Sequence, residues 1–148
     1  MRALRQVLKY ETGQFYRRHH DQNSPATSMW GPRIYTFFMY MNDADTPEPG
    51  KAASAGGEAL TGGETHFPVL NLTVKPKMGR ALLWPSILDQ TPLVRDDRTD
   101  HEALVVTGGI KYAANYWLHL YDFQEANALG CGNKEVFGNW GSEAMTPR

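Results

Sequence analysis

Apolar residues along this chain recur in short runs rather than with a long helical period. The runs are rich in β-branched, aromatic and leucine residues, and clusters of Gly, Pro or Asp separate them. They span Leu4–Tyr10, Phe15–Asp21, Ile34–Asn42, Ala81–Trp84, Glu102–Val106 and Ile110–Tyr121. Such runs are typical of β-strands. Many short strands with turn residues between them predict a sandwich or a barrel.

The segments outside these runs predict irregular structure. Residues 41–63 combine acidic residues with Pro, Gly and Ala and show no amphipathic period, so we expect a long mobile surface loop there. Asp122–Leu129 has a weak helical pattern, and residues 130–148 predict an irregular tail. At 148 residues and without an internal repeat, the chain is expected to form one domain, 1–148.

The run Ile110–Tyr121 divides into two faces, because alternate residues of a strand point the same way. One face is apolar and holds Tyr112, Ala114, Tyr116, Leu118 and Leu120. The other face is mixed and holds Lys111, Ala113, Asn115, Trp117 and His119. A mixed face suits the lining of a polar pocket better than a dry core. We therefore expect the first face to pack and the second to line a site.

Composition excludes several classes of protein. The chain is 41% hydrophobic and 21% charged, as is typical of a globular protein. Its net charge of -1 shows no excess of positive charge for binding nucleic acid or an anionic membrane surface. The longest apolar run, Phe37–Met41, is too short to span a membrane, and no secretory signal is visible at the start. The single cysteine, Cys131, excludes an internal disulfide and a cysteine-based zinc site.

Two histidines and a carboxylate are candidates for metal binding. On a strand, His19 and Asp21 project to the same side while His20 points away, and His101 precedes another apolar run. Two histidines and one carboxylate with open positions form the facial triad of non-haem Fe(II) oxygenases, and the same set can hold zinc for hydrolysis. Oxygenases of this kind also need a cation for the far carboxylate of a 2-oxo acid. Lys111 is the candidate, unless it is a lysine that snorkels at a sheet edge.

A series of motifs gives a resemblance to a known family. The chain contains, in this order, Tyr10-x-x-Gly13-Gln14-x-Tyr16-x-x-His19-x-Asp21, Arg33-x-x-Thr36, Tyr40-x-Asn42, Gly62-Gly63-Glu64-Thr65-x-Phe67-Pro68, Pro76-x-x-Gly79-x-Ala81, His101-Glu102, Gly108-x-x-Lys111 and Trp117. Together they resemble the prolyl 4-hydroxylase branch of the 2-oxoglutarate- and Fe(II)-dependent dioxygenases. The resemblance implies a mainly β fold, a double-stranded β-helix or jelly-roll core with the iron at one open end.

The resemblance also implies roles for individual residues. The residues that resemble the iron ligands are His19, Asp21 and His101. Lys111 resembles the residue that pairs with the far carboxylate of 2-oxoglutarate, and Thr65 and the Tyr10 hydroxyl resemble its helpers. These six side chains are therefore expected to form one catalytic and cosubstrate site.

Two further residues resemble substrate contacts. They are Arg33 and Trp117, for which a surface ion pair and a core aromatic are the alternatives. The remaining histidines receive no functional role; they are His20, His66 and His119.

The chain departs from the family's pattern in two places. Only nine residues precede Tyr10, whereas family members usually carry helices and strands there that brace the outer face of the sheet. We therefore expect a shortened N-terminus and an apolar face, Tyr112–Leu120, without its cover. The loop before Gly62 is also longer than the usual short turn, which affects substrate access but not the iron site.

The function that the resemblance implies is hydroxylation of a peptidyl proline at C4. The reaction would use Fe(II), 2-oxoglutarate and O2 and release succinate and CO2, and ascorbate would keep the iron reduced. Lys111 favours this branch over lysyl-type relatives, which usually place arginine there. The alternatives are a related oxygenase with another substrate, a catalytically inactive jelly-roll binding module and a zinc hydrolase. By resemblance alone, the expected compartment is the endoplasmic reticulum.

Overall fold

The computed structural model describes residues 3–24, 31–44 and 59–122. Within these ranges the regular secondary structure is almost entirely β-strand. Its elements are β1 (Ala3–Glu11), β2 (Tyr16–His19), β3 (Arg33–Tyr40), β4 (Thr61–Gly62), β5 (Thr65–Phe67), β6 (Leu72–Val74), β7 (Ala81–Pro85), β8 (Ile87–Leu88), β9 (Thr91–Arg95), the 3-10 helix η1 (Asp97–Thr99), β10 (His101–Ala103), β11 (Val106–Gly108) and β12 (Ile110–His119). Most of the expected 41–63 loop, the weak helix and the 130–148 tail lie outside the described residues.

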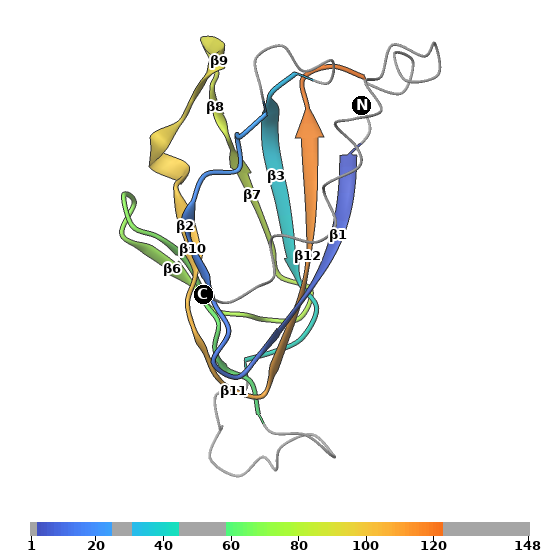
Figure 1. The fold of residues 1–148 in the computed structure, drawn as a ribbon, viewed down its shortest axis with the longest axis vertical. Coiled ribbons are helices and arrows are strands. Elements are labelled where there is room, and N and C mark those ends of the chain that lie inside the picture. Colours follow the sequence, from blue (N-terminus) through green and yellow to red (C-terminus); the bar gives the residue numbers. More distant parts are fainter. Residues whose placement is uncertain (1–2, 25–30, 45–58, 123–148) are drawn as a thin grey trace.

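Two four-stranded antiparallel sheets face each other and converge toward β11 (Figure 1). The larger sheet has the order β1-β12-β3-β7, and the smaller has the order β2-β10-β5-β6. Neighbours in each sheet are mostly far apart in sequence, so the chain crosses between the layers repeatedly. This arrangement confirms the predicted jelly-roll core. Among the described residues, no helix is long and apolar enough to cross a membrane.

The core lies between the two sheets. It holds Leu8, Phe38, Tyr40, Phe67, Trp84 and Ala113. The register explains this set, because residues opposite each other on antiparallel strands share a face. Ala113 of β12 lies opposite both Leu8 of β1 and Tyr40 of β3, so all three point inward. The next inward position of β12 is Lys111, opposite Tyr10.

The outer face of the larger sheet is apolar and exposed. Tyr112 is 39% exposed, whereas its neighbour Lys111 is 1% exposed. Val7 and Leu83 on the same sheet are 67% and 65% exposed. Of the face expected to lack cover, Tyr112 is exposed, whereas Ala114, Tyr116, Leu118 and Leu120 are half-buried, so the expectation is met only at the Tyr112 end. The expectation that this face packs is wrong, since the mixed face of β12 is the buried one.

Several strand boundaries differ from the sequence prediction. The run Glu102–Val106 is two strands, because β10 ends at Ala103 and β11 begins at Val106. Leu104 leaves the ladder to donate its N–H to the Glu64 carbonyl at 2.8 Å. The run Phe15–Asp21 is also shorter than expected, since β2 ends at His19 and Asp21 lies in a bend. The five short strands β4, β5, β6, β8 and β9 were not predicted.

Candidate functional site

His19, Asp21 and His101 meet where β2 and β10 run side by side. The register places His19 directly opposite His101, and their ring centroids are 4.3 Å apart. The Nε2 atom of each ring lies 3.7 Å from an oxygen of Asp21, Oδ1 for His19 and Oδ2 for His101. All three ligand atoms lie within 4.8 Å of one another. The structure therefore brings the three predicted residues together, although Asp21 reaches the site from a bend rather than a strand.

Hydrogen bonds orient both imidazoles in the same way. Nδ1 of His19 lies 2.9 Å from the carbonyl of Arg17, and Nδ1 of His101 lies 2.9 Å from the carbonyl of Thr99. A carbonyl only accepts, so each Nδ1 donates, and each Nε2 is the ring nitrogen that faces Asp21. Burial, with the nearby His101, lowers the pKa of His19 to about 4. His19 is thus neutral at pH 7, which is the form that binds a metal ion.

A threonine from the opposite sheet holds the carboxylate of Asp21. Thr36 of β3 is buried, and its hydroxyl donates a 2.6 Å hydrogen bond to Oδ2 of Asp21. Hydrogen bonds of this kind fix a ligating carboxylate before the metal arrives. The motif Arg33-x-x-Thr36 contained this residue, but no sequence pattern connected it with Asp21.

The ammonium group of Lys111 is buried inside the sandwich. Its Nζ has no hydrogen-bond partner among the described residues. It lies 5.2 Å from the ring centroid of Tyr10 and 5.5 Å from those of Phe38 and Tyr40. This burial lowers the pKa of Lys111 to about 8, and the nearby Glu64 partly offsets it. A buried cation without a partner is costly, so this position favours binding of an anion.

Hydroxyl groups line the path from Lys111 toward the histidines. The Tyr40 hydroxyl donates a 2.6 Å hydrogen bond to Oγ1 of Thr65, and Thr65 lies opposite Ala103, two residues after His101. Burial raises the pKa of both Tyr10 and Tyr40 to about 12, so both phenols keep their protons at neutral pH. Tyr40 was not predicted as a site residue. Its inward position in β3, two residues after Phe38, was the available signal.

Comparison with known proteins identifies the family. A family model described as the 2OG-Fe(II) oxygenase superfamily matches residues 5–119. The chain belongs to this superfamily. Prolyl 4-hydroxylase 1 of Arabidopsis thaliana is 33% identical over 131 residues, which cover 78% of this chain and 40% of that protein. Prolyl 4-hydroxylase subunit alpha-1 of Bos taurus is 32% identical over 120 residues, which cover 77% of this chain and 19% of that protein.

A solved structure supports the same branch of the superfamily. The viral collagen prolyl hydroxylase of Paramecium Bursaria Chlorella virus-1, in its 2OG complex, matches with a TM-score of 0.61 and 30% identity over 80% of this chain and 59% of that one. Within the superfamily, the chain is therefore similar to prolyl 4-hydroxylases. It spans less than half the length of the curated relatives it matches.

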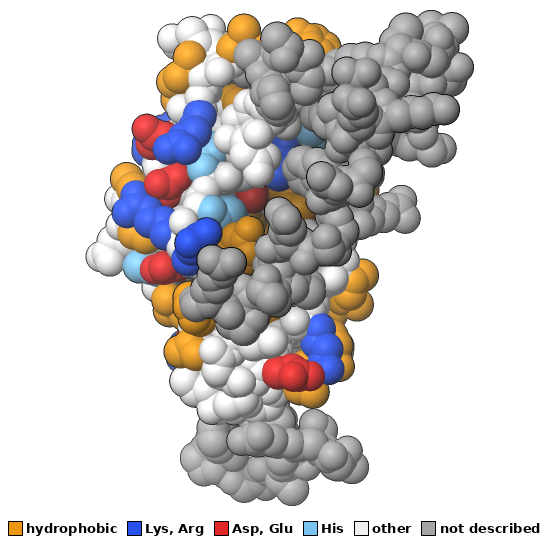
Figure 2. Space-filling view, viewed as in Figure 1, with side chains coloured by type: hydrophobic (Ala, Val, Ile, Leu, Met, Phe, Trp, Pro, Cys, Tyr) orange, Lys and Arg blue, Asp and Glu red, His pale blue; other side chains and the backbone are white. Residues whose placement is uncertain are grey.

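The residues of the site fit both Fe(II) and 2-oxoglutarate, the two groups named in the description of the superfamily. Two imidazoles and a carboxylate are a ligand set that suits Fe(II) and leaves open positions. The unpartnered Lys111 ammonium suits a carboxylate of 2-oxoglutarate. Histidine, arginine and acidic side chains gather over β2 and β10 on the face drawn in Figure 2. Side-chain exposure of 30% at His19 leaves the metal side of the site open to solvent.

The two expected substrate residues contact each other. The guanidinium of Arg33 lies 4.1 Å from the ring centroid of Trp117. Arg33 is buried, and its Nη1 donates to the Asp21 carbonyl at 3.2 Å, so the surface position considered for it is wrong. Trp117 lies on the inward face with Lys111, opposite Thr36, as the alternation predicted.

The three histidines without a predicted role differ in their surroundings. His66 pairs with Glu102 at 2.8 Å, and the two side chains are 27% and 29% exposed. Nδ1 of His119 lies 3.3 Å from the Gly31 carbonyl. His20 is buried and contacts the segment before His101.

Proposed function

We propose that this chain is the catalytic domain of a 2-oxoglutarate-dependent dioxygenase that hydroxylates a peptidyl proline at C4, with His19, Asp21 and His101 as its iron ligands. The observation that carries the proposal is the buried ammonium of Lys111, which has no partner in the described part of the chain. It lies in the same interior as the three metal-binding side chains. A metal site alone would suit many reactions, whereas a metal site with a buried anion partner suits a 2-oxo acid cosubstrate.

The residues around Lys111 would bind and orient the cosubstrate. Lys111 would pair with the far carboxylate, and the hydroxyls of Tyr10 and Thr65 would donate hydrogen bonds to the same end, while Tyr40 donates to Thr65. The phenols are suited to this because their raised pKa values, about 12, keep the protons in place. The aromatic rings around Lys111 keep water away from the ion pair and so strengthen it.

The other end of the site would position the metal. His19, Asp21 and His101 would hold Fe(II), while Thr36 and the carbonyls of Arg17 and Thr99 keep the three ligands in orientation. When bound, Fe(II) with 2-oxoglutarate and O2 supplies the oxidising chemistry, in which the oxo acid becomes succinate and CO2 and a substrate C–H becomes C–OH. Ascorbate would return iron that becomes oxidised to the ferrous state.

The proposed substrate is a proline-containing peptide or protein. Support comes from the names of the relatives, which are prolyl 4-hydroxylases and a viral collagen prolyl hydroxylase. Trp117 would contact the peptide, and Arg33 would support both Trp117 and the backbone of Asp21.

A hydroxylation assay tests the proposal. Purified protein with Fe(II), 2-oxoglutarate and ascorbate would receive a proline-rich peptide, the same peptide with alanine in place of proline, a lysine-containing peptide or free proline. We expect hydroxyproline and succinate in equal amounts from the proline-rich peptide alone. Hydroxylation of lysine or free proline would contradict the substrate, and peptide binding without succinate would indicate a binding module.

A further inference from the structure

His20 lies between two metal ligands in sequence, yet it faces away from them and is only 8% exposed. Its Nδ1 accepts a 3.0 Å hydrogen bond from the backbone N–H of Gln22. Nδ1 therefore carries a lone pair, and the ring proton is on Nε2. Nε2 lies 3.0 Å from the carbonyl oxygen of Asp96, to which it donates. One neutral imidazole thus joins two segments that are 76 residues apart in the sequence.

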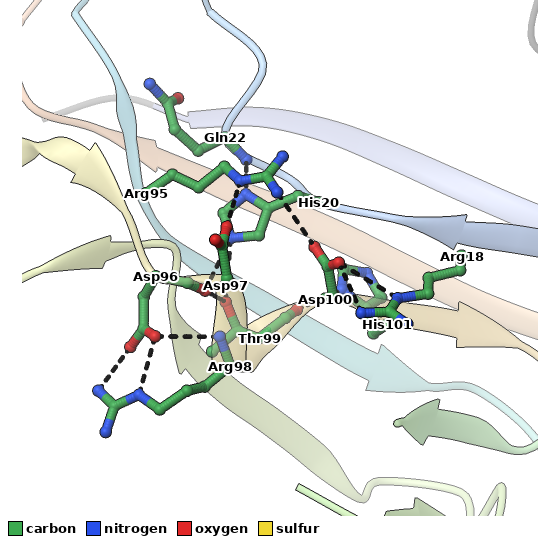
Figure 3. Close-up of polar contacts among 10 residues, drawn as sticks. All are labelled: Arg18, His20, Gln22, Arg95, Asp96, Asp97, Arg98, Thr99, Asp100 and His101. Atoms are coloured by element: carbon green, nitrogen blue, oxygen red, sulfur yellow. Dashed lines mark hydrogen bonds and ion pairs between the residues drawn. The ribbon is translucent and has the colours of Figure 1, made fainter. Parts of the chain in front are cut away.

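The segment that His20 contacts, residues 96–99, is a turn held by its own hydrogen bonds. Asp96 caps η1, accepting at Oδ1 from the backbone N–H of Arg98 at 3.1 Å and pairing at Oδ2 with Nη2 of Arg98 at 2.7 Å. The Thr99 hydroxyl donates to the Asp96 carbonyl at 2.9 Å and lies 3.2 Å from Nε2 of His20. Figure 3 shows His20 facing this turn, which leads directly into His101. His20 contacts this turn at the carbonyl of Asp96 and the hydroxyl of Thr99.

The turn connects His20 with the third metal ligand. Thr99 contacts His20 through its hydroxyl, and its carbonyl holds Nδ1 of His101 at 2.9 Å. On the other side of His20, the bonded Gln22 immediately follows Asp21, and Gln22 also accepts at Oε1 from the backbone N–H of Arg33. Hydrogen bonds of His20, together with residue Thr99 itself, therefore connect the bend that carries Asp21 with the ring of His101.

We propose that His20 is a positioning residue of the metal site. It ties the segment of His19 and Asp21 to the turn before His101 and so sets the separation of the three ligands. The proposal rests on the proposed metal site, but it concerns a residue that touches neither metal nor substrate. Partners of this kind commonly change metal affinity by about 10-fold to 100-fold when they are removed.

Two variants, each with an amide in place of the imidazole, test the two hydrogen bonds of His20 one at a time. In His20→Asn the side-chain oxygen can still accept from the Gln22 N–H, but the amide is too short to reach Asp96. In His20→Gln the longer amide can donate to the Asp96 carbonyl. Mn(II) would be titrated into each metal-free protein and followed by electron paramagnetic resonance. We expect the Kd to rise about 10-fold in His20→Asn and to recover at least in part in His20→Gln.

A second readout separates positioning from general stability. The visible spectrum of bound Co(II) reports the geometry of its ligands, and we expect it to change in His20→Asn. His66→Phe is the matched control, because His66 hydrogen-bonds Glu102, the neighbour of His101, without contacting the ligand-bearing turn. Its Mn(II) affinity and Co(II) spectrum should equal those of the wild type.

Each outcome decides the proposal. A folded His20→Asn variant with the wild-type Mn(II) affinity and Co(II) spectrum overturns it, even if the urea midpoint falls. If His20→Asn does not fold, Thr99→Val replaces it, because this change removes the hydroxyl and leaves the carbonyl that holds His101. Unchanged affinity there overturns the proposal as well. A wild-type protein that binds no Mn(II) contradicts the metal site itself.

Discussion

At the scale of single residues, Lys111 combines a cost to folding with an expected gain in binding. Its ammonium is 1% exposed and contacts aromatic rings rather than an acid. The shift of its pKa from 10.5 to about 8 corresponds to roughly 3 kcal/mol, since one pKa unit is about 1.4 kcal/mol. A buried ammonium that destabilises the fold in this way indicates that its positive charge serves binding.

Replacing Lys111 with methionine should therefore separate stability from function. We expect Lys111→Met to raise the free energy of unfolding of the ligand-free protein at pH 7 by about 1 to 3 kcal/mol in urea denaturation. The same change should weaken 2-oxoglutarate binding at least 10-fold in calorimetry. Lys9→Met is the control, because Lys9 is exposed and pairs with Glu11. An unchanged 2-oxoglutarate affinity in Lys111→Met would remove Lys111 from the cosubstrate site.

The lowered pKa of Lys111 also predicts how binding depends on pH. Below about pH 8 the group already carries its proton, so binding of the dianion needs no proton uptake and its affinity stays level. Above about pH 8 one proton must be taken up, and the Kd should rise toward 10-fold for each pH unit. Lys111→Arg should not show this rise below pH 10, because a guanidinium stays charged. Calorimetry from pH 6.5 to 9.5 measures both profiles, and an identical rise in Lys111→Arg would assign it to another group.

Residue types in order along the chain predicted the candidate ligands, which the structure brings together, but not the residues that hold them in place. His19, Asp21, His101 and Lys111 were identified because their chemistry and spacing match a family. Thr36 and Tyr40 were missed because each hydrogen-bonds a partner that becomes a neighbour only when the sheets face each other. His20 was given no role for the same reason, since Asp96 is distant in sequence.

At the scale of elements, the Gly62-Gly63 pair before β5 allows a close approach to Lys111. Gly63 has a φ of +71°, and a Cβ atom there would lie 3.1 Å from Cδ of Lys111 and 3.1 Å from Cγ2 of Val106. A side chain at this position thus adds backbone strain and a contact with the proposed cosubstrate lysine. This gives a physical reason for glycine in the Gly-Gly-Glu-Thr motif.

Gly63→Ala should therefore lower both stability and cosubstrate affinity. We expect a loss of about 1 to 2 kcal/mol in the free energy of unfolding, from the positive φ and the tight contacts, and several-fold weaker 2-oxoglutarate binding. Gly13→Ala is the matched control, because Gly13 has a φ of +87° and a Cβ atom added there would meet nothing within 4 Å. It should lose stability but keep its affinity for 2-oxoglutarate. Equal affinity losses in both variants would mean that strain alone is responsible.

Strand prediction was most accurate where a run was long, and the strands that it missed are short. β1, β3 and β12 are eight to ten residues long and were found within two residues of their ends. β4 and β8 have two residues each, too few for an alternation to be seen. The division of Glu102–Val106 depends on β10 and β11 pairing with different partners, which no local pattern reveals.

At the scale of the whole molecule, the jelly roll brings three separate parts of the chain to one interior. β2 and β10 of the smaller sheet carry the two histidines of the candidate metal site, while β3 and β12 of the larger sheet carry Thr36 and Lys111. The fold class and family were predicted correctly because the motifs cover most of the strands that build this interior. The peptide sequence and the compartment stay predictions, since neither follows from the fold.

The central claim is that Fe(II) and 2-oxoglutarate bind together at His19, Asp21, His101 and Lys111. Anaerobic addition of Fe(II) and then 2-oxoglutarate, followed by visible absorption, tests it most directly. A broad charge-transfer band in the green should appear only when both are present, and it should be absent in Asp21→Ala. In Lys111→Met the band should require at least 10-fold more 2-oxoglutarate. No band in the wild type at saturating concentrations, or an equal band in Asp21→Ala, would contradict the account.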